Sequence, residues 1–246
     1  MSATAYLQQA AVALQCVERE QLDGIRRAAG LVVEAIRADR TLYSFGASHS
    51  FMVTEELVYR AGGLMLVNPV YPHGMNSLVR PITLTSRLER IAGLGAELLG
   101  ATPAREGDVL FLASTSGRNT VVVDMAIAAR AKGLKIVGIT SLAYSGSVAS
   151  RHPSGKKLAE LCDVVLDNGA PPGDAVVAIR GFPQRVAPIS SFTAIAIVNA
   201  LVAEVVQRLV DAGVTPPVFM SANLDGGDAF NARLLAENRH RIHYLE

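Results

Sequence analysis

The stretch that decides the fold is Asp108-Val-Leu-Phe-Leu-Ala-Ser-Thr-Ser-Gly-Arg-Asn-Thr120. Its apolar run, Val109–Ala113, passes directly into a loop of small hydroxyl residues. We expect a helix over about 118–132, because Gly133 is a typical residue for ending one. A second, mainly apolar run follows at Lys135–Ile139. A strand, a helix and a second strand in this order predict two parallel strands joined by a helix.

The same alternation extends on both sides of this unit. Most of the short apolar runs lack the polar–apolar alternation of half-exposed strands, which indicates strands covered on both faces. We expect strands at Thr41–Phe45, Leu64–Val67, Val109–Ala113, Lys135–Ile139 and Val164–Leu166. We expect helices between them at about 51–61, 87–99, 118–132 and 156–162. Ser86 and Glu89 have the spacing of a capping box at the start of the helix over 87–99.

This order of elements predicts an α/β fold with a doubly wound, mainly five-stranded parallel sheet flanked by helices. The flavodoxin-like strand order 2-1-3-4-5 makes strands 1 and 3 neighbours. Extra helices are expected in the regions outside the alternation, at 5–38, at about 189–212 and at the end of the tail 214–246. Because no long linker divides the sequence, we expect one domain over 1–246 with its core at about 35–205.

The composition excludes several classes of protein. Half of the residues are hydrophobic, and 23 basic residues against 22 acidic ones give a net charge of only +1, so a nucleic-acid partner is not expected. Residues 1–36 lack the pattern of a signal peptide. The most apolar stretch, Phe192–Val206, is interrupted by Asn199 and Glu204, so we expect a helix buried on nearly all sides, in the core or at a subunit interface, and no membrane segment. We therefore expect a cytoplasmic protein.

The two cysteines and the histidines show no metal-binding pattern. Cys16 and Cys162 lie in predicted apolar faces and are expected to be reduced. Because no cluster of His, Cys, Asp and Glu has the spacing of metal ligands, we expect neither a structural metal nor a cofactor.

Two loops at strand ends share a composition suited to an anion. Gly46-Ala-Ser-His-Ser50 follows the first strand, and Ser114–Thr120 follows the third, each before a helix. Small hydroxyl side chains and the free N–H groups of a helix N-terminus both favour a bound anion. Since strands 1 and 3 are expected to be neighbours, both loops should face one crevice and hold one tetrahedral anion.

The second loop resembles a known family. Ser114-Thr-Ser-Gly-Arg-Asn119 resembles the S-x-S-G-x-T phosphate motif of SIS (sugar isomerase) domains, with Asn119 where Thr is usual, and Gly46–Ser50 resembles the family's first phosphate loop. The resemblance covers about 35–205, and the tail Pro217–Asp228 resembles an uncharacterised bacterial branch. It implies a small phosphorylated sugar as partner, held by Ser48, Ser50, Ser114, Thr115, Ser116, Gly117, Asn119, Thr120, Ser190 and Ser191.

The resemblance also implies candidates for catalysis. Related sugar isomerases move a proton between C1 and C2 of an open-chain phosphosugar, which needs a carboxylate base and an acid or shuttle, often His. Glu55-Glu56-Leu57 is similar to a stretch of phosphoheptose isomerases that supplies the base, which favours Glu56 over Glu55. His49, within the first loop, and His73, on a long Pro-rich loop, are the candidate histidines.

Two departures keep other functions open. Thr193 stands where phosphoheptose isomerases present a His, and Ser141–Ser147 carries no carboxylate where glucosamine-phosphate isomerase domains have a Glu. An aldose–ketose isomerase is the leading hypothesis. The alternatives are an etherase or lyase similar to those acting on N-acetylmuramic acid 6-phosphate, and a non-catalytic phosphosugar sensor. The family resemblance and the apolar helix over 189–212 also predict a homodimer or homotetramer.

Overall fold

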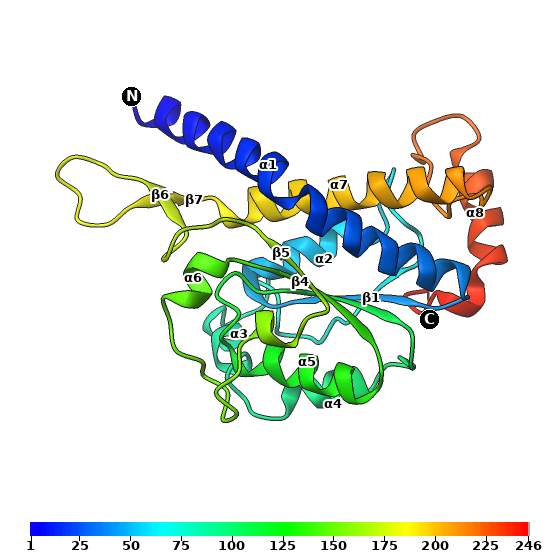
Figure 1. Cartoon of the computed structure of the whole chain (residues 1–246), viewed down its shortest axis with the longest axis horizontal. Helices are drawn as coiled ribbons and strands as arrows, with labels where there is room; N and C mark the ends of the chain where they lie inside the picture. The colour runs from blue at the N-terminus through cyan, green and yellow to red at the C-terminus, as the bar shows by residue number, and fades with distance from the viewer. Residues whose placement is uncertain (246) are drawn as a thin grey trace.

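The computed structural model of the chain describes residues 1–245 (Figure 1). Its centre is a five-stranded parallel sheet in the order β2-β1-β3-β4-β5, so the predicted α/β fold and strand order are confirmed. The strands are β1 Leu42–Gly46, β2 Val67–Pro69, β3 Val109–Ala113, β4 Lys135–Thr140 and β5 Val164–Asp167. A short antiparallel pair, β6 Ala175–Val177 and β7 Val186–Pro188, lies outside the sheet.

Helices cover both faces of the sheet, as Figure 1 shows. One face carries α1 Ser2–Arg37, α2 Phe51–Leu57 and α7 Ser190–Asp211, and the other carries α4 Leu94–Gly100 and α5 Thr120–Ala131. The remaining helices are α3 Thr83–Leu88, α6 Leu142–Gly146 and α8 Gly227–Glu237, with 3₁₀ turns η1 Ser48–Ser50, η2 Leu158–Leu161 and η3 Arg239–Arg241. The predicted extra helices at both ends of the chain are therefore present.

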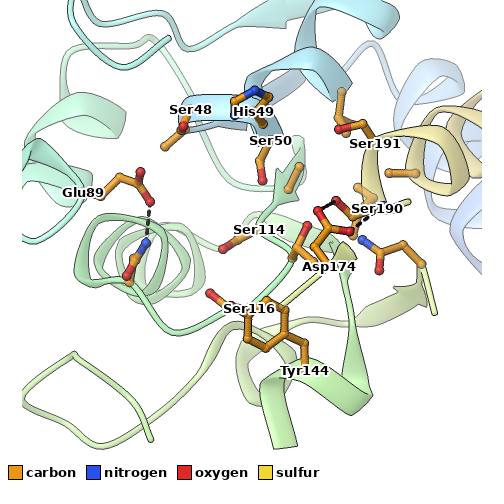
Figure 2. A pocket seen from close by; sticks show the side chains of 18 residues that line it. Ser48, His49, Ser50, Glu89, Ser114, Ser116, Tyr144, Asp174, Ser190 and Ser191 are labelled. Carbon is orange, nitrogen blue, oxygen red and sulfur yellow. Dashed lines mark hydrogen bonds between the residues drawn. The ribbon is translucent and has the colours of Figure 1, made fainter. Parts of the chain in front are cut away.

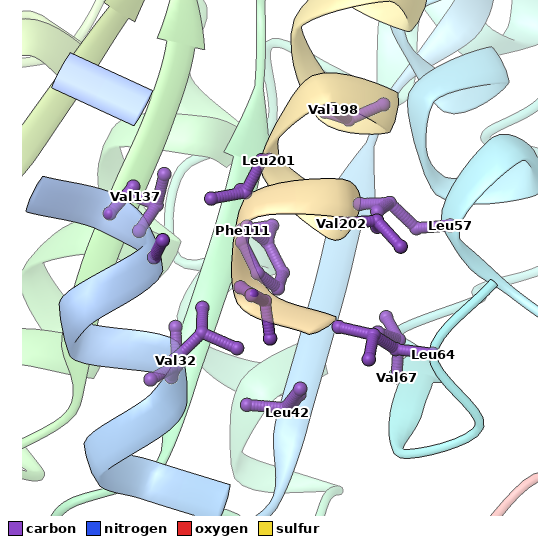
Figure 3. Close-up of a cluster of buried hydrophobic side chains, with 14 of the residues drawn as sticks. Val32, Leu42, Leu57, Leu64, Val67, Phe111, Val137, Val198, Leu201 and Val202 are labelled. Atoms are coloured by element: carbon purple, nitrogen blue, oxygen red, sulfur yellow. The ribbon is translucent and has the colours of Figure 1, made fainter. Parts of the chain in front are cut away.

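Two hydrophobic cores lie on the two faces of the sheet. Side chains alternate along a strand, so Phe111 of β3 enters the core beneath α1 and α7, whereas Leu110 and Leu112 enter the core beneath α5. Figure 3 shows Phe111 in the first of these cores, together with Leu201 and Val202 of α7. Burying both faces explains why the strands read as continuous apolar runs.

Helix α7 is long and apolar enough to cross a membrane by length and composition alone, with a mean hydropathy of 1.6. Its inner residues, among them Ile197, Leu201 and Val205, are fully buried against α1, α2 and the sheet. The helix is therefore part of the core of this fold. It is not buried on all sides, because Phe192 and Val210 on its outer stripe are about half exposed.

The helix expected over 87–99 is the largest departure from the sequence-based prediction. The chain forms α3 and α4 with a break between them, and Gly93, at φ +81°, is the cap of α4. The side-chain oxygen Oδ2 of Asp124 on α5 accepts a hydrogen bond from Gly93 N at 2.7 Å. The predicted capping box of Ser86 and Glu89 is wrong, since Glu89 lies after α3 rather than inside a helix.

Smaller differences concern element ends. The segment 156–162 forms the 3₁₀ turn η2 rather than an α-helix, and α2 ends at Leu57, earlier than the expected 61. The second strand, expected at Leu64–Val67, forms at Val67–Pro69. Leu64 lies outside it and pairs instead with Val218 in an isolated antiparallel bridge. The expected helix stop at Gly133 is confirmed by its φ of +77°.

Candidate functional site

A pocket of about 240 Å³ lies at the carboxyl ends of β1 and β3 (Figure 2). This is the crevice at which open α/β sheets bind their ligands. Its polar lining comes from both expected loops and from four further segments. The polar residues are Ser48, His49, Ser50, Glu89, Ser114, Thr115, Ser116, Asn119, Tyr144, Asn168, Asp174, Ser190 and Ser191.

The first loop depends on a glycine. A Cβ on Gly46 would lie 2.2 Å from the backbone oxygen of Ser50, so no side chain fits there. The turn that follows places Ser48 at φ +56°, a conformation that costs a non-glycine residue free energy. Ser48 N donates to Met75 O at 2.6 Å, which connects this turn to the Pro-rich loop that carries His73. The loop is thus a tight, locally strained turn that presents its serines to the pocket.

The second loop is held by backbone hydrogen bonds to its neighbours. Ser114 N donates to Ile139 O at 3.0 Å, and Ser141 N donates to Thr115 O at 2.9 Å. Gly117, at φ +59°, closes a turn through its N–H to Ser114 O. The backbone is fixed, while the side chains stay free. Among residues 1–245, no protein partner is found for the hydroxyl groups of Ser48, Ser50, Ser114, Thr115 and Ser116.

Glu89 places a carboxylate in the same pocket. It lies in the break between α3 and α4, and burial raises the pKa of its carboxyl group, against the lowering effect of Asn119 and of the charges on Arg151 and Arg90. Figure 2 shows it on the opposite side of the serine loops from Asp174. A carboxyl group with a raised pKa is a candidate general base or acid.

Asp174 forms the other acidic wall and fixes the start of α7. Its carboxylate accepts hydrogen bonds from Ile189 N, from Ser190 N and, at 2.6 Å, from the hydroxyl of Ser190. It therefore satisfies N–H groups that a helix start leaves free. Both Ser190 and Ser191 line the pocket, and the hydroxyl of Ser190 is bonded to Asp174.

The chain matches the family model described as SIS domain over residues 5–141, more than half of its length. This chain belongs to the SIS-domain family. A UPF0309 protein of Shouchella clausii is 48% identical to this SIS domain over 219 residues, which cover 89% of each chain.

Solved structures share the fold of this SIS domain at low sequence identity. Phosphoheptose isomerase GmhA from Neisseria gonorrhoeae is 17% identical, with a TM-score of 0.58 over 83% of this chain and 97% of that one. The Vibrio vulnificus NanR protein complexed with ManNAc-6P is also 17% identical, with a TM-score of 0.54 over 96% of this chain and 69% of that one. At this identity the likeness establishes the fold alone.

Most of the residues expected to hold phosphate line the pocket of this SIS domain, but two do not. Gly117 shapes the turn behind it, and the hydroxyl of Thr120 donates to Arg151 O at 3.3 Å. Asn119 reaches the pocket wall, yet its side chain is bonded to Glu89 and Arg151. The phosphate-loop residues thus divide into those with free groups and those that support the loop.

The structure places the three residues expected to act in catalysis in three different surroundings. His49 lines the pocket. His73 is exposed and packs against the ring of Tyr71. Glu56 is turned toward α7, where its carboxylate accepts from Asn199 Nδ2 at 2.6 Å and pairs with Arg60. Its neighbour Glu55 lines a separate hollow of about 260 Å³ beside His49.

Sequence reasoning missed Glu89, Tyr144, Asn168 and Asp174. Two of them follow strand ends: Tyr144 lies shortly after β4, and Asn168 comes directly after β5. The rule that ligands bind at the carboxyl ends of parallel strands would have indicated these two. Asp174 and Glu89 lie in irregular segments for which the sequence carried no such signal.

The structure brings together no group of three or more His, Cys, Asp or Glu side chains among residues 1–245 that could hold a metal ion. Both cysteines are free thiols. Burial raises the pKa of the Cys162 thiol to about 12, so this thiol stays protonated and unreactive at neutral pH.

Proposed function

We propose that this SIS domain binds a small phosphorylated sugar and interconverts its aldose and ketose forms. One observation carries the proposal: five free hydroxyl groups on the two strand-end loops share a pocket with the partly buried carboxyl group of Glu89. Phosphate takes the hydrogen bonds that Ser48, Ser50, Ser114, Thr115 and Ser116 offer. The N-terminus of α5 adds a favourable dipole.

In this proposal the phosphate lies against the serine loops, and the sugar lies across the pocket between Glu89 on one wall and Tyr144, Asn168, Ser191 and Asp174 on the other. Asn168 is buried, and its Oδ1 accepts from Ala170 N at 3.1 Å, which leaves its amide nitrogen to donate to a sugar oxygen. The pocket therefore offers hydroxyl groups for the phosphate at the serine loops, and hydrogen-bond donors and acceptors for the sugar hydroxyls along its two walls. A free sugar without phosphate fills only the second set.

Glu89 serves as the general base in the proposed reaction, in place of Glu56. Its carboxylate takes the proton from C2 of the open-chain aldose, and the C–H electrons form the C1–C2 double bond of an enediolate. His49 donates a proton to O1 and removes the one on O2. The proton on Glu89 then returns to C1, which gives the ketose. The pKa raised by burial makes Glu89 a stronger base than an exposed carboxylate.

Phosphate recognition is tested by a thermal-shift screen with hexose, heptose, pentose and amino-sugar phosphates, each beside its phosphate-free sugar. A ligand at about 100 times its Kd stabilises the folded protein by roughly 2.7 kcal/mol, which is visible as a higher Tm. We expect a rise with one phosphosugar, none with its free sugar, and a reduced rise in Ser116→Ala. If every phosphosugar leaves Tm unchanged, the binding proposal is wrong.

A non-catalytic sensor is the second candidate function. It is favoured by the similarity to the Vibrio vulnificus NanR protein complexed with ManNAc-6P, because the aligned region covers 96% of this chain. A sensor gives a thermal shift without any conversion of the bound phosphosugar. Product analysis by NMR on the ligand found in the screen separates the two functions, and lactate release from a lactyl amino-sugar phosphate identifies an etherase.

We propose further that the chain assembles as a homodimer or homotetramer through the outer stripe of α7. Phe192 and Val210 on this stripe are 41% and 55% exposed in the single chain. Light scattering should give a multiple of the 26.0 kDa chain mass, and Phe192→Asp should shift the protein toward that single mass. A wild-type mass of one chain would exclude the assembly.

A further inference from the structure

The side chain of Asn119 bridges the pocket carboxylate and an arginine outside the pocket. Its Nδ2 donates to Glu89 Oε2, and its Oδ1 accepts from Arg151 Nη1 at 2.8 Å. We propose that Asn119 and Arg151 are positioning residues that aim the Glu89 carboxylate into the pocket, and that a partly buried His152–Asp124 pair holds them in place. The role of Glu89 as base rests on the proposed function; the positioning itself does not.

An asparagine suits this place because it offers a donor and an acceptor at the same end of one side chain. A carboxylate with little access to water needs a hydrogen-bond donor, and the amide supplies it. Arg151 then fixes the amide, since its charged donor settles which end of the amide faces Glu89. With both ends of its amide engaged, Asn119 supports the carboxylate rather than the phosphate.

The backbone of Arg151 is tied to the same loop. Arg151 N donates to Arg118 O at 2.9 Å, and Thr120 Oγ1 donates to Arg151 O at 3.3 Å. Because these bonds lie on both sides of Asn119 in the sequence, the segment after α6 and the start of α5 form one unit. A displacement of Arg151 therefore moves the amide that holds Glu89.

The next residue anchors this unit. His152 Nε2 lies 2.9 Å from Asp124 Oδ1, and its Nδ1 lies 2.7 Å from Ser154 Oγ. The His152 and Asp124 side chains are only 12% and 11% exposed. Asp124 also accepts from Gly93 N, at the far side of the break that holds Glu89. One aspartate thus joins the Arg151 segment, through His152, to the segment that carries Glu89.

Several charged and titratable groups surround Glu89. The charges on Arg151 and Arg90 lower the pKa of its carboxyl group, as does the hydrogen bond from Asn119, and burial raises it. His49, Tyr144 and Asp174 line the same pocket. Without Asn119 or Arg151, one of the interactions that lower the pKa of Glu89 is lost, while the effect of burial remains. The pKa of Glu89 should therefore rise further above its ordinary value.

The experiment compares Asn119→Leu, Arg151→Leu and His152→Gln with the wild-type chain. The titration of Glu89 is followed by NMR with carbon-13-labelled glutamate, and its signal is assigned by its loss in Glu89→Gln. We expect a higher titration midpoint in Asn119→Leu and Arg151→Leu, and a smaller rise in His152→Gln. His240→Gln is the matched control, because His240 Nε2 makes a similar 2.8 Å contact to Asp39 near the opposite ends of the strands.

The kinetic readout is a fall in kcat of about 10²-fold with KM nearly unchanged, as expected for a misplaced catalytic group. An unchanged Glu89 midpoint in either leucine variant would overturn the positioning role, and the exposed Arg151 provides that test if Asn119→Leu does not fold. If the wild-type protein turns over no phosphosugar, the proposed reaction fails, while the NMR titration still decides the positioning role.

Discussion

Replacing Glu89 by Gln is expected to lower kcat by about 10²–10⁴-fold, the usual contribution of a general base. Glutamine keeps the size of the side chain and an oxygen that can accept from Asn119, so the pocket should retain its shape. Phosphosugar binding, followed as the thermal shift, should change little. The measurement is isomerase turnover on the phosphosugar found in the screen, with binding measured on the same preparation.

Glu56→Gln is the matched control, since Glu56 is the carboxylate that the sequence analysis favoured as the base. Its side chain is bonded to Asn199 and Arg60 rather than directed into the pocket, so kcat should stay near the wild-type value. The opposite pattern, with Glu56→Gln inactive and Glu89→Gln active, would return the role of base to Glu56.

The proposed role of Glu89 also predicts how the activity of the wild-type protein depends on pH. A general base must be ionised, and burial raises the pKa of the Glu89 carboxyl group. Activity should therefore be full above this raised pKa and should fall as the pH drops through it. The acidic limb should lie at a higher pH than the titration of an ordinary glutamate.

The second large effect is expected for Gly46→Ala. The new Cβ would lie 2.2 Å from the backbone oxygen of Ser50, and neither backbone segment can yield without moving η1. Overpacking of this kind costs about 1–3 kcal/mol of stability, or several degrees in Tm. Because Ser48 and Ser50 move with η1, the thermal shift caused by the phosphosugar should be lost as well.

Gly146→Ala serves as the control for this variant. Gly146 is the last residue of α6, and a Cβ there meets no atom within 4 Å. This variant should keep both its Tm and its phosphosugar response. A Gly46→Ala protein that binds like wild type would show that the tight turn is not needed for phosphate recognition.

The strands and the proposed phosphate-binding loops could be predicted from the sequence, because each is a short local segment and the order of the strands is the usual one for such an alternation. Val109–Ala113 reads as a strand buried on both faces, and the hydroxyl residues after it meet those after Phe45 as soon as strands 1 and 3 are neighbours. The pairing of strands 1 and 3 in this common strand order is the only long-range contact needed to bring Ser48, Ser50, Ser114 and Ser116 together.

The position of the proposed base, Glu89, could not be predicted, because distant contacts decide it. In the sequence, Glu89 has the spacing of a helix cap. The break between α3 and α4 that places it in the pocket depends on the bond from Gly93 N to Asp124 and on the close packing of Gly95 against Val121 of α5. Glu56 lies at a plausible distance along α2 from the first loop. Its orientation depends on Asn199, which is 143 residues away in the sequence.

The two ends of the pocket are built by different parts of the chain, and this affects how such a protein can evolve. The serines follow β1 and β3, whereas Tyr144, Asp174 and Ser191 lie on segments outside the sheet. Substitutions in these outer segments can alter which sugar fits without disturbing the turn at Gly46 or the strands beneath it. Under the proposed function, a lineage can therefore exchange one phosphorylated sugar for another while it inherits unchanged loops that hold the phosphate.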